Sequence, residues 1–183
     1  RFSSAFAYGR NKLDVLLNET VQYLPEGSTV LDIGCGTGKY LNWYVQSGFK
    51  ATGLEPSPEM RAIAQRYNPG APILDGTADA LPFSDQSFDF VSAIEVLRYL
   101  HPMDIQKAFR EMARVLKPGG RLFVTLVNRY ALDGFYPYYA FRNLLSRGGR
   151  KQQSVHCQFV TPRQVRRDLS GLGFSEIALH GRM

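Results

Sequence analysis

The chain is poor in cysteine and has no long apolar run. Its 183 residues include two cysteines. Cys35 and Cys157 have no metal-ligand spacing and give no disulfide framework, which favours a reducing compartment, so we expect a cytoplasmic protein. No apolar stretch approaches the roughly 18 residues of a membrane-spanning helix, and the printed residues show no secretory signal. This composition argues against a disulfide-stapled scaffold and against a membrane-spanning protein.

Acidic residues are absent from one long segment, Gly134 to Arg167. That segment carries seven basic residues, whereas the rest of the chain carries fifteen basic and sixteen acidic ones. The formal net charge of +6 therefore comes from this segment alone. Such asymmetry predicts an anionic partner and says little about the fold. The seven are Arg142, Arg147, Arg150, Lys151, Arg163, Arg166 and Arg167.

Strands and helices are expected to alternate along the whole chain. With 44% apolar and 21% charged residues, a chain of this length predicts one globular domain. The alternation predicts an α/β fold with a doubly wound, mostly parallel, Rossmann-like sheet and helices on both faces. The expected helices are at about 13–24, 40–46, 59–66, 104–115 and 161–172, and the expected strands are at 30–33, 51–54, 73–74, 90–94, 122–127 and 174–179.

The most informative motif is a short strand that runs into a glycine turn. The strand 30–33 is followed by Gly34, Gly36 and Gly38, and the next strand ends at Glu55. This layout is typical of a nucleoside-binding βαβ unit, in which glycines let the backbone approach the ligand and the acid accepts hydrogen bonds from the ribose. A dinucleotide fingerprint would need glycine where Lys39 stands, so the spacing argues against a dehydrogenase.

Two further motifs follow in order, and together with the glycine turn they carry a family resemblance. Residues 81–89 read L-P-F-S-D-Q-S-F-D, and residues 116–124 read L-K-P-G-G-R-L-F-V. From about residue 6 to residue 127 the chain resembles the class I S-adenosylmethionine-dependent methyltransferases. Within that family it is most similar to the small-molecule, ubiquinone- and menaquinone-pathway branch known as methyltransferase type 11. The resemblance implies one methyltransferase domain over 1–183, with an acceptor-binding cap at about 129–160. It also implies that the family's last strand is missing, since the printed sequence stops near its expected start.

The resemblance assigns S-adenosylmethionine as cofactor and implies which residues bind it. Asp32 would orient the glycine loop or reach the cofactor's ammonium group through water. The family motif G-D-A-E reads G-T-A-D here, so contact between a carboxylate and adenine depends on Asp79; the alternative is a solvated loop acid. The glycines could also serve only to make a tight turn. The implied cofactor-binding residues are Tyr8, Asp32, Gly34, Cys35, Gly36, Gly38, Glu55, Pro56, Thr77, Ala78, Asp79 and Ile94.

The acceptor site is expected after the strand at 90–94 and in the aromatic stretch that begins the acid-free segment. Five aromatic residues lie between Phe135 and Phe141; they either line an acceptor pocket or pack on the sheet. Family members often read V-L-E-H-L where this chain reads V-L-R-Y-L, so Tyr99 takes the usual place of histidine. No catalytic residue and no metal ligand is therefore assigned. The candidate substrate-binding residues are Glu95, Tyr99, Phe135, Tyr136 and Tyr139.

Taken together, these features predict transfer of a methyl group from S-adenosylmethionine to a small aromatic, lipid-like or anionic acceptor. An RNA methyltransferase is the second hypothesis, because aromatic residues beside basic ones can stack on bases and neutralise phosphates. A third is a methyltransferase-like binding subunit without activity. The basic segment also suits peripheral contact with a membrane that holds a quinone-like substrate. The sequence leaves open whether O, N or C is methylated, and what the oligomeric state is.

Overall fold

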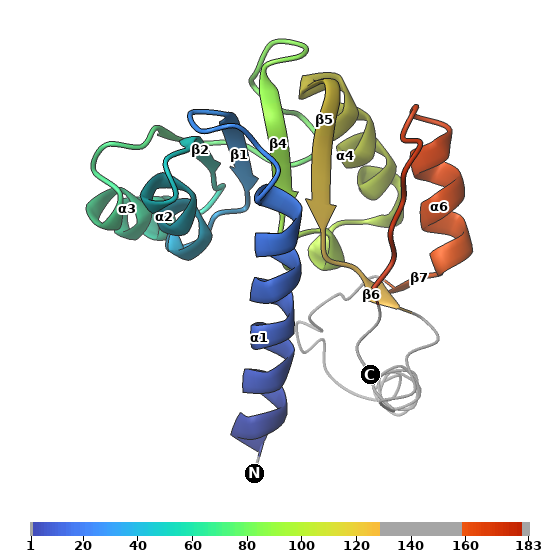
Figure 1. Cartoon of the computed structure of the whole chain (residues 1–183), viewed down its shortest axis with the longest axis horizontal. Coiled ribbons are helices and arrows are strands. Elements are labelled where there is room, and N and C mark those ends of the chain that lie inside the picture. Colours follow the sequence, from blue (N-terminus) through green and yellow to red (C-terminus); the bar gives the residue numbers. More distant parts are fainter. Residues whose placement is uncertain (1, 129–158, 181–183) are drawn as a thin grey trace, which may run out of the picture.

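The computed structural model describes residues 2–128 and 159–180, and their side chains from residue 12 in the first range and from 160 in the second. Five parallel strands form one sheet in the order β3-β2-β1-β4-β5, with helices on both faces (Figure 1). The predicted α/β fold with a parallel sheet is thus confirmed. The strands of this sheet are β1 Thr29–Ile33, β2 Lys50–Leu54, β3 Ile73–Leu74, β4 Phe88–Ala93 and β5 Leu116–Val124.

The helices begin close to where local sequence signals place them. Ser57 caps its helix by accepting a hydrogen bond from the backbone N–H of Met60, and proline occupies the following position. Thr161 does the same through the N–H of Gln164, again with proline next. The first helix is longer than predicted at its N-terminal end. The helices are α1 Phe2–Val21, α2 Lys39–Gln46, α3 Pro58–Tyr67, the 3-10 helix η1 Leu97–Tyr99, α4 Pro102–Val115 and α6 Pro162–Ser170.

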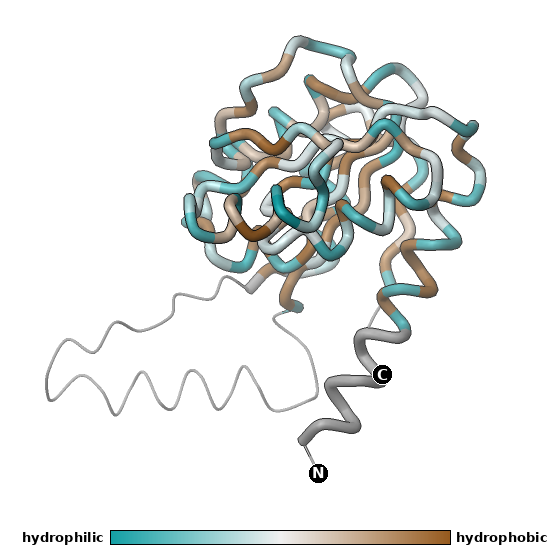
Figure 2. Tube along the Cα trace, turned by 90° about the vertical axis from the view of Figure 1, so that its left-hand side faces the viewer, coloured by the Kyte–Doolittle hydropathy of each residue, from teal (hydrophilic) through white to brown (hydrophobic). Residues whose placement is uncertain are grey.

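Alternate residues of the strands feed two hydrophobic clusters, one on each face of the sheet. Val30 of β1 packs with residues of α1, α2 and α3, whereas its neighbour Leu31 packs with residues of α4 and α6. Because both faces are covered, the central strands are apolar on both sides. Figure 2 shows apolar and polar residues alternating along the helices and strands, as expected of elements that are covered on one side. The polar side chains of β1 and β4 that lie inside this core, Asp32 and Ser92, therefore stand out.

The last third of the described chain differs from the prediction. A single strand was expected at 122–127, but β5 begins at Leu116 and ends at Val124, and the separate strand β6 (Val127–Asn128) pairs with β7 (Phe159–Val160). The strand expected at 174–179 is wrong, because this segment has no regular secondary structure. Phe174 and Ile177 nevertheless pack against the cluster beside α4 and α6. The apolar pattern of this segment thus reflects side-chain burial without a backbone ladder.

Most of the predicted cap segment, 129–160, lies outside the described residues; only β7 belongs to them. Among the described residues, no helix is long and apolar enough to cross a membrane.

Candidate functional site

The carboxyl ends of the central strands are aligned at one edge of the sheet. Ile33 is in register with Leu54 of β2 on one side and with Ala93 of β4 on the other, and Ala93 is in register with Val124 of β5. The residues that follow these strands therefore emerge side by side at this edge, where ligands bind in open parallel sheets. Those residues are Gly34, Glu55, Ile94 and Thr125.

The turn after β1 needs glycine at three positions for different reasons. Gly34, Gly36 and Gly38 have φ of +64°, +57° and +86°, a region that favours glycine. A Cβ on Gly34 would lie 2.4 Å from Val96, and one on Gly38 would lie 2.4 Å from Nδ2 of Asn68. A Cβ on Gly36 would meet no described atom within 4 Å. Two of the glycines thus allow close packing, and the third faces open space.

Glu55 holds this turn from the end of β2. It is 7% exposed, and its two carboxylate oxygens each accept a backbone hydrogen bond. Oε2 accepts from the N–H of Gly36 at 3.0 Å, and Oε1 accepts from the N–H of Ser57 at 2.9 Å. A carboxylate has about four lone-pair positions, so each oxygen can accept one further hydrogen bond. Glu55 therefore supports the glycine turn and keeps acceptor capacity on both carboxylate oxygens.

Asp32 is the most deeply buried acid at this edge, with 2% exposure. Its Oδ1 accepts a hydrogen bond from the hydroxyl of Ser92 at 2.9 Å, and its Oδ2 has no hydrogen-bond partner among the described residues. Burial raises the pKa of Asp32 to about 7; the Ser92 hydrogen bond opposes the rise and the charge of Glu55 adds to it. The site thus contains a buried carboxyl group that titrates near neutral pH.

Ser92 and Tyr44 complete this buried cluster and were not predicted. Both are fully buried, and the hydroxyl of Tyr44 has no hydrogen-bond partner among the described residues. Burial and the charge of Asp32 raise the pKa of Tyr44, so its phenol stays neutral. A serine within the otherwise apolar run 90–94 was the available signal. For Tyr44 the sequence offered none, since a tyrosine on α2 is also compatible with a surface position.

Cys35 contributes through its backbone. Its N–H and that of Gly34 both donate to the carbonyl of Leu54, at 3.1 and 2.7 Å. The side chain is buried, and its sulfur would lie 2.8 Å from a Cβ on Gly53, so this glycine makes room for it. Burial raises the pKa of the Cys35 thiol to about 12, and the charges of Asp32 and Glu55 act in the same direction. The thiol is therefore protonated and is a poor nucleophile.

The predicted adenine-contact residues form a tight turn ahead of β4. The N–H of Ala80 donates to the carbonyl of Thr77 at 3.3 Å, which closes the turn. Within it Ala78 is buried at 3% exposure, Thr77 is exposed and Asp79 is half-buried. Burial of Ala78 anchors the turn and leaves the Asp79 carboxylate partly accessible. Pro56, another predicted contact, is exposed beside Glu55.

The residues after β4 are held in an unusual backbone conformation. Glu95 has φ of +61°, and its N–H donates to Oγ1 of Thr125 at 2.6 Å. Its carboxylate forms an ion pair with Arg98 at 2.6 Å. A non-glycine residue with positive φ stores strain of the kind found at functional sites. Ile94 is half-buried against the α2 side of the sheet, and Tyr99 is 57% exposed.

Several predicted site residues cannot be placed. The backbone of Tyr8 belongs to α1, but its side chain lies outside the described part of the molecule. The aromatic residues Phe135, Tyr136 and Tyr139 also lie outside it. The described residues thus bring the cofactor candidates other than Tyr8 together around the ends of β1, β2, β3 and β4. Of the five substrate-binding candidates, they include Glu95 and Tyr99.

A parallel sheet with a glycine turn, a buried acid after the second strand and a partly accessible acid after the third defines a nucleoside-binding α/β domain. A family profile described as "Methyltransferase domain" matches residues 31–124, just over half of the chain. The chain belongs to this methyltransferase family.

Relatives and solved structures agree with that assignment. The chain is 33% identical to a demethylmenaquinone methyltransferase of Chlorobaculum tepidum over 153 residues, covering 81% of this chain and 62% of the relative. It is 41% identical to an uncharacterized methyltransferase of Mycobacterium tuberculosis over 93 residues, covering 51% of this chain and 37% of the relative. The crystal structure of an SAM-dependent methyltransferase from Thermotoga maritima, described as a possible histamine N-methyltransferase, is 28% identical with a TM-score of 0.63. That match covers 86% of this chain and 69% of the other.

The predicted family, fold class and cofactor of that family, S-adenosylmethionine, are confirmed by these matches. The chain spans between about a third and about three fifths of the two curated relatives, 37% and 62% of their lengths.

Proposed function

We propose that this chain binds S-adenosylmethionine at the turn after β1 and transfers its methyl group to a small aromatic, lipid-like or anionic acceptor. The observation that carries the proposal is the arrangement of Glu55 and Gly36. A buried carboxylate at the end of β2 supports the glycine turn and keeps acceptor capacity for two ribose hydroxyls.

The described residues fit this cofactor at three points. Gly36 faces space that a Cβ would enter, Glu55 can accept further hydrogen bonds, and Asp32 has an unpartnered oxygen. A neighbouring ammonium group would favour the charged form of Asp32, which burial otherwise disfavours. The half-buried Asp79 supplies a carboxylate on the adenine side. These residues would bind the methionine, ribose and adenine parts of the cofactor in turn.

When bound, the cofactor supplies a methyl group on a sulfonium centre that is a good leaving group. The protein then has to align the acceptor with this methyl group and exclude water. Gly34 and Val96 pack closely, and the N–H of Glu95 donates to Thr125; these contacts hold the segment after β4, which carries the substrate-binding candidates Glu95 and Tyr99. A general base is needed only for a weak, protonated acceptor.

Charge and relatives support the acceptor class. Three residues of the acid-free segment, Arg163, Arg166 and Arg167, lie exposed on α6. They favour an acceptor with a carboxylate or phosphate group, or one held at an anionic membrane surface. The Chlorobaculum relative is named for demethylmenaquinone, which supports an aromatic, lipid-like acceptor. A cytoplasmic location and a single domain over 1–183 with a cap at 129–160 belong to the same proposal.

Calorimetric titration with S-adenosylhomocysteine tests cofactor binding. We expect the wild type to bind in the micromolar range and Glu55→Gln to bind at least tenfold more weakly, which corresponds to about 1.4 kcal/mol. The matched control is Glu176→Gln, the same change at an exposed position in the C-terminal segment. Absence of binding by folded wild-type protein would refute the proposal, as would equal affinity of Glu55→Gln and the control.

Transfer of a labelled methyl group tests the acceptor. The cofactor would be incubated with the protein and either a short-chain demethylquinol or total RNA. We expect methylation of the quinol. Methylation of RNA alone would refute the small-molecule acceptor and support the second hypothesis. Cofactor binding with no transfer to either would favour the binding subunit.

A further inference from the structure

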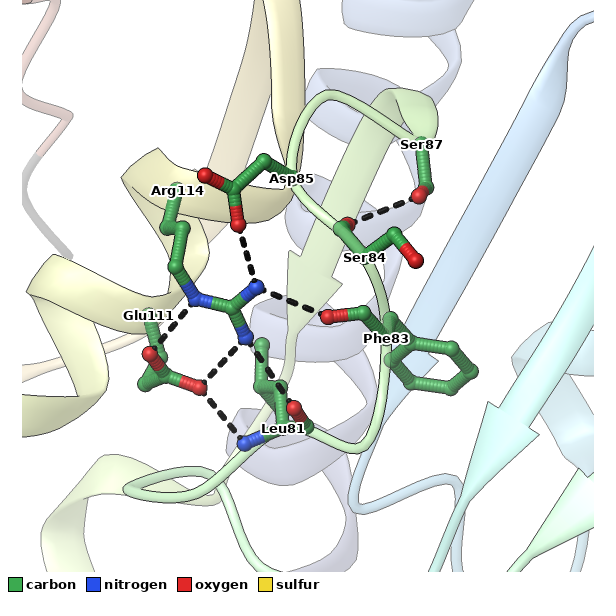
Figure 3. Close-up of polar contacts among 7 residues, drawn as sticks. All are labelled: Leu81, Phe83, Ser84, Asp85, Ser87, Glu111 and Arg114. Carbon is green, nitrogen blue, oxygen red and sulfur yellow. Dashed lines mark hydrogen bonds and ion pairs between the residues drawn. The ribbon is translucent and has the colours of Figure 1, made fainter.

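A guanidinium group on α4 is bonded to the loop that leads into β4 (Figure 3). Arg114 donates to the carbonyls of Leu81 and Phe83, at 3.0 and 2.7 Å, and to the carboxylate of Asp85 at 2.8 Å. It also donates to both carboxylate oxygens of Glu111, at 2.8 Å each. Of these five hydrogen bonds, three join α4 to the loop and two bind Glu111 on the same helix.

Glu111 completes this grip on Leu81. Its Oε2 accepts the backbone N–H of Leu81 at 2.8 Å, while Arg114 binds the carbonyl of the same residue. Both backbone groups of Leu81 are therefore bonded to one ion pair, and its side chain is buried at 6% exposure. The hydrogen bond from Arg114 lowers the pKa of Glu111, and the hydrogen bonds to Glu111 and Asp85 raise the pKa of Arg114. Both side chains therefore stay charged at neutral pH.

The place of Leu81 in the chain makes this grip relevant to the cofactor site. The residue directly follows the turn 77–80, which carries Asp79. The turn has one buried side chain of its own, that of Ala78, and the strand before it, β3, is only two residues long. A turn with so little local support depends on what holds its ends.

The other end of this turn is held by a second arginine. Arg61 of α3 donates from Nη1 to the carboxylate of Asp75 at 2.8 Å. The same nitrogen donates to the carbonyls of Glu55 and Pro56, at 2.7 and 2.8 Å. Arg61 therefore ties the start of the turn to the residue that faces the ribose. The two arginines come from helices on opposite faces of the sheet and hold the two ends of one turn.

We propose that Arg61 and Arg114 are positioning residues that hold the turn 77–80 in the shape that recognises the adenine of the cofactor, an inference that rests on the proposed function. Neither side chain has to touch the cofactor. Each sets the distance between the Asp79 carboxylate and the ribose-binding Glu55, so that base and ribose are recognised together. Arg114 donates from all three of its nitrogens to separate acceptors, a forked geometry that a guanidinium group provides and an ammonium group does not.

The choice between adenine and hypoxanthine tests this role. S-adenosylhomocysteine carries an amino group that donates a hydrogen bond to a carboxylate, whereas S-inosylhomocysteine carries a carbonyl there, which can only accept. We expect calorimetry to show that the wild type prefers the adenine compound at least tenfold. In Arg114→Gln and in Arg114→Lys this preference should fall at least fivefold. The matched control, Lys107→Gln, removes an exposed ion pair with Asp104 on the same helix and should keep the wild-type preference.

Hydrogen exchange gives a second readout that needs no ligand. The amide of Leu81 should exchange at least tenfold faster in Arg114→Gln than in the wild type, since Glu111 loses its orienting partner. If Arg114→Gln does not fold, Glu111→Gln takes its place, because it keeps an acceptor for Leu81 and removes the charge.

The outcomes separate this inference from the function on which it rests. Failure of the wild type to bind S-adenosylhomocysteine would overturn the proposed function and this inference with it. Binding by a folded variant with an unchanged adenine preference would overturn the positioning role alone. Equal Leu81 exchange in the variant and the wild type would also count against it.

Discussion

Replacing Asp32 by asparagine should stabilise the fold at alkaline pH and weaken cofactor binding. Burial raises the pKa of this carboxyl group from 3.8 to about 7, against the hydrogen bond from Ser92. The native state therefore resists its ionisation, whereas the unfolded chain does not. An asparagine keeps the shape and an oxygen acceptor for Ser92, but it carries no charge at any pH.

The size of the effect follows from the pKa difference. Because the folded pKa is raised, the contribution of Asp32 to stability is fully present below pH 3.8 and is lost as the pH rises through about 7. Between pH 5 and pH 8 this loss is about 2–3 kcal/mol, since each unit of pKa difference corresponds to about 1.4 kcal/mol. The wild type should lose that stability over this range and Asp32→Asn should not.

Urea unfolding at several pH values measures the difference between the two proteins. Cys35 and Tyr44, whose pKa values are raised by burial and by the charge of Asp32, stay protonated over this pH range, so the difference isolates Asp32. Trp43, the one tryptophan of the chain, lies half-buried on α2 and reports unfolding by fluorescence. Calorimetry at pH 8 should show that Asp32→Asn binds S-adenosylhomocysteine at least tenfold more weakly, because it removes the charge that we propose faces the cofactor's ammonium group. A gain in stability with a loss of binding is typical of a functional buried charge.

A stability difference that stays constant between pH 5 and pH 8 would refute this reasoning. It would mean that Asp32 titrates in the native state as it does in the unfolded chain. The variant Ser92→Ala offers a check in the opposite sense. It removes the hydrogen-bond donor that favours the charged form of Asp32. In this variant the pH at which the stability contribution of Asp32 is lost should therefore be higher than in the wild type.

Two further predictions concern the glycine turn and the opposite edge of the sheet. Gly36→Ala should cost about 1 kcal/mol in urea unfolding yet weaken S-adenosylhomocysteine binding at least tenfold, because its methyl group meets no described atom and enters the ligand space. Gly38→Ala should lower the free energy of unfolding by about 2–4 kcal/mol, because its Cβ would collide with Asn68. Equal losses of stability in the two glycine variants would contradict this account. Burial would raise the pKa of Asp89, but Lys117 and Thr29 outweigh it and lower the pKa to about 2. The stabilising contribution of Asp89 is therefore present above pH 3.8 and is lost as the pH falls through 2. Asp89→Asn should be less stable than the wild type at neutral pH, and this difference in unfolding free energy should disappear in acid. A difference that persists at pH 2 would show that the ion pair is not its source.

The sequence by itself determined the cofactor half of the protein. The strand, the three glycines and Glu55 lie within 26 residues, and their roles depend on local geometry: left-handed backbone at the glycines and an acid at a strand end. The N-termini of the helices after Ser57 and Thr161 could be predicted for the same reason, since a capping residue and the proline that follows it act within one turn. Information of this kind is complete in a short stretch of chain.

Only the tertiary structure decided which distant groups meet. Asp32 accepts a hydrogen bond from Ser92, sixty residues away, because β1 and β4 pair in one particular register. Arg114 reaches Leu81 because α4 crosses beside the loop before β4, and a lone arginine on a helix gives no sign of that. The irregular segment 174–179 has the pattern of a strand but no ladder. Alternation of apolar residues reports burial, whereas hydrogen-bond partners depend on how separate elements are brought together.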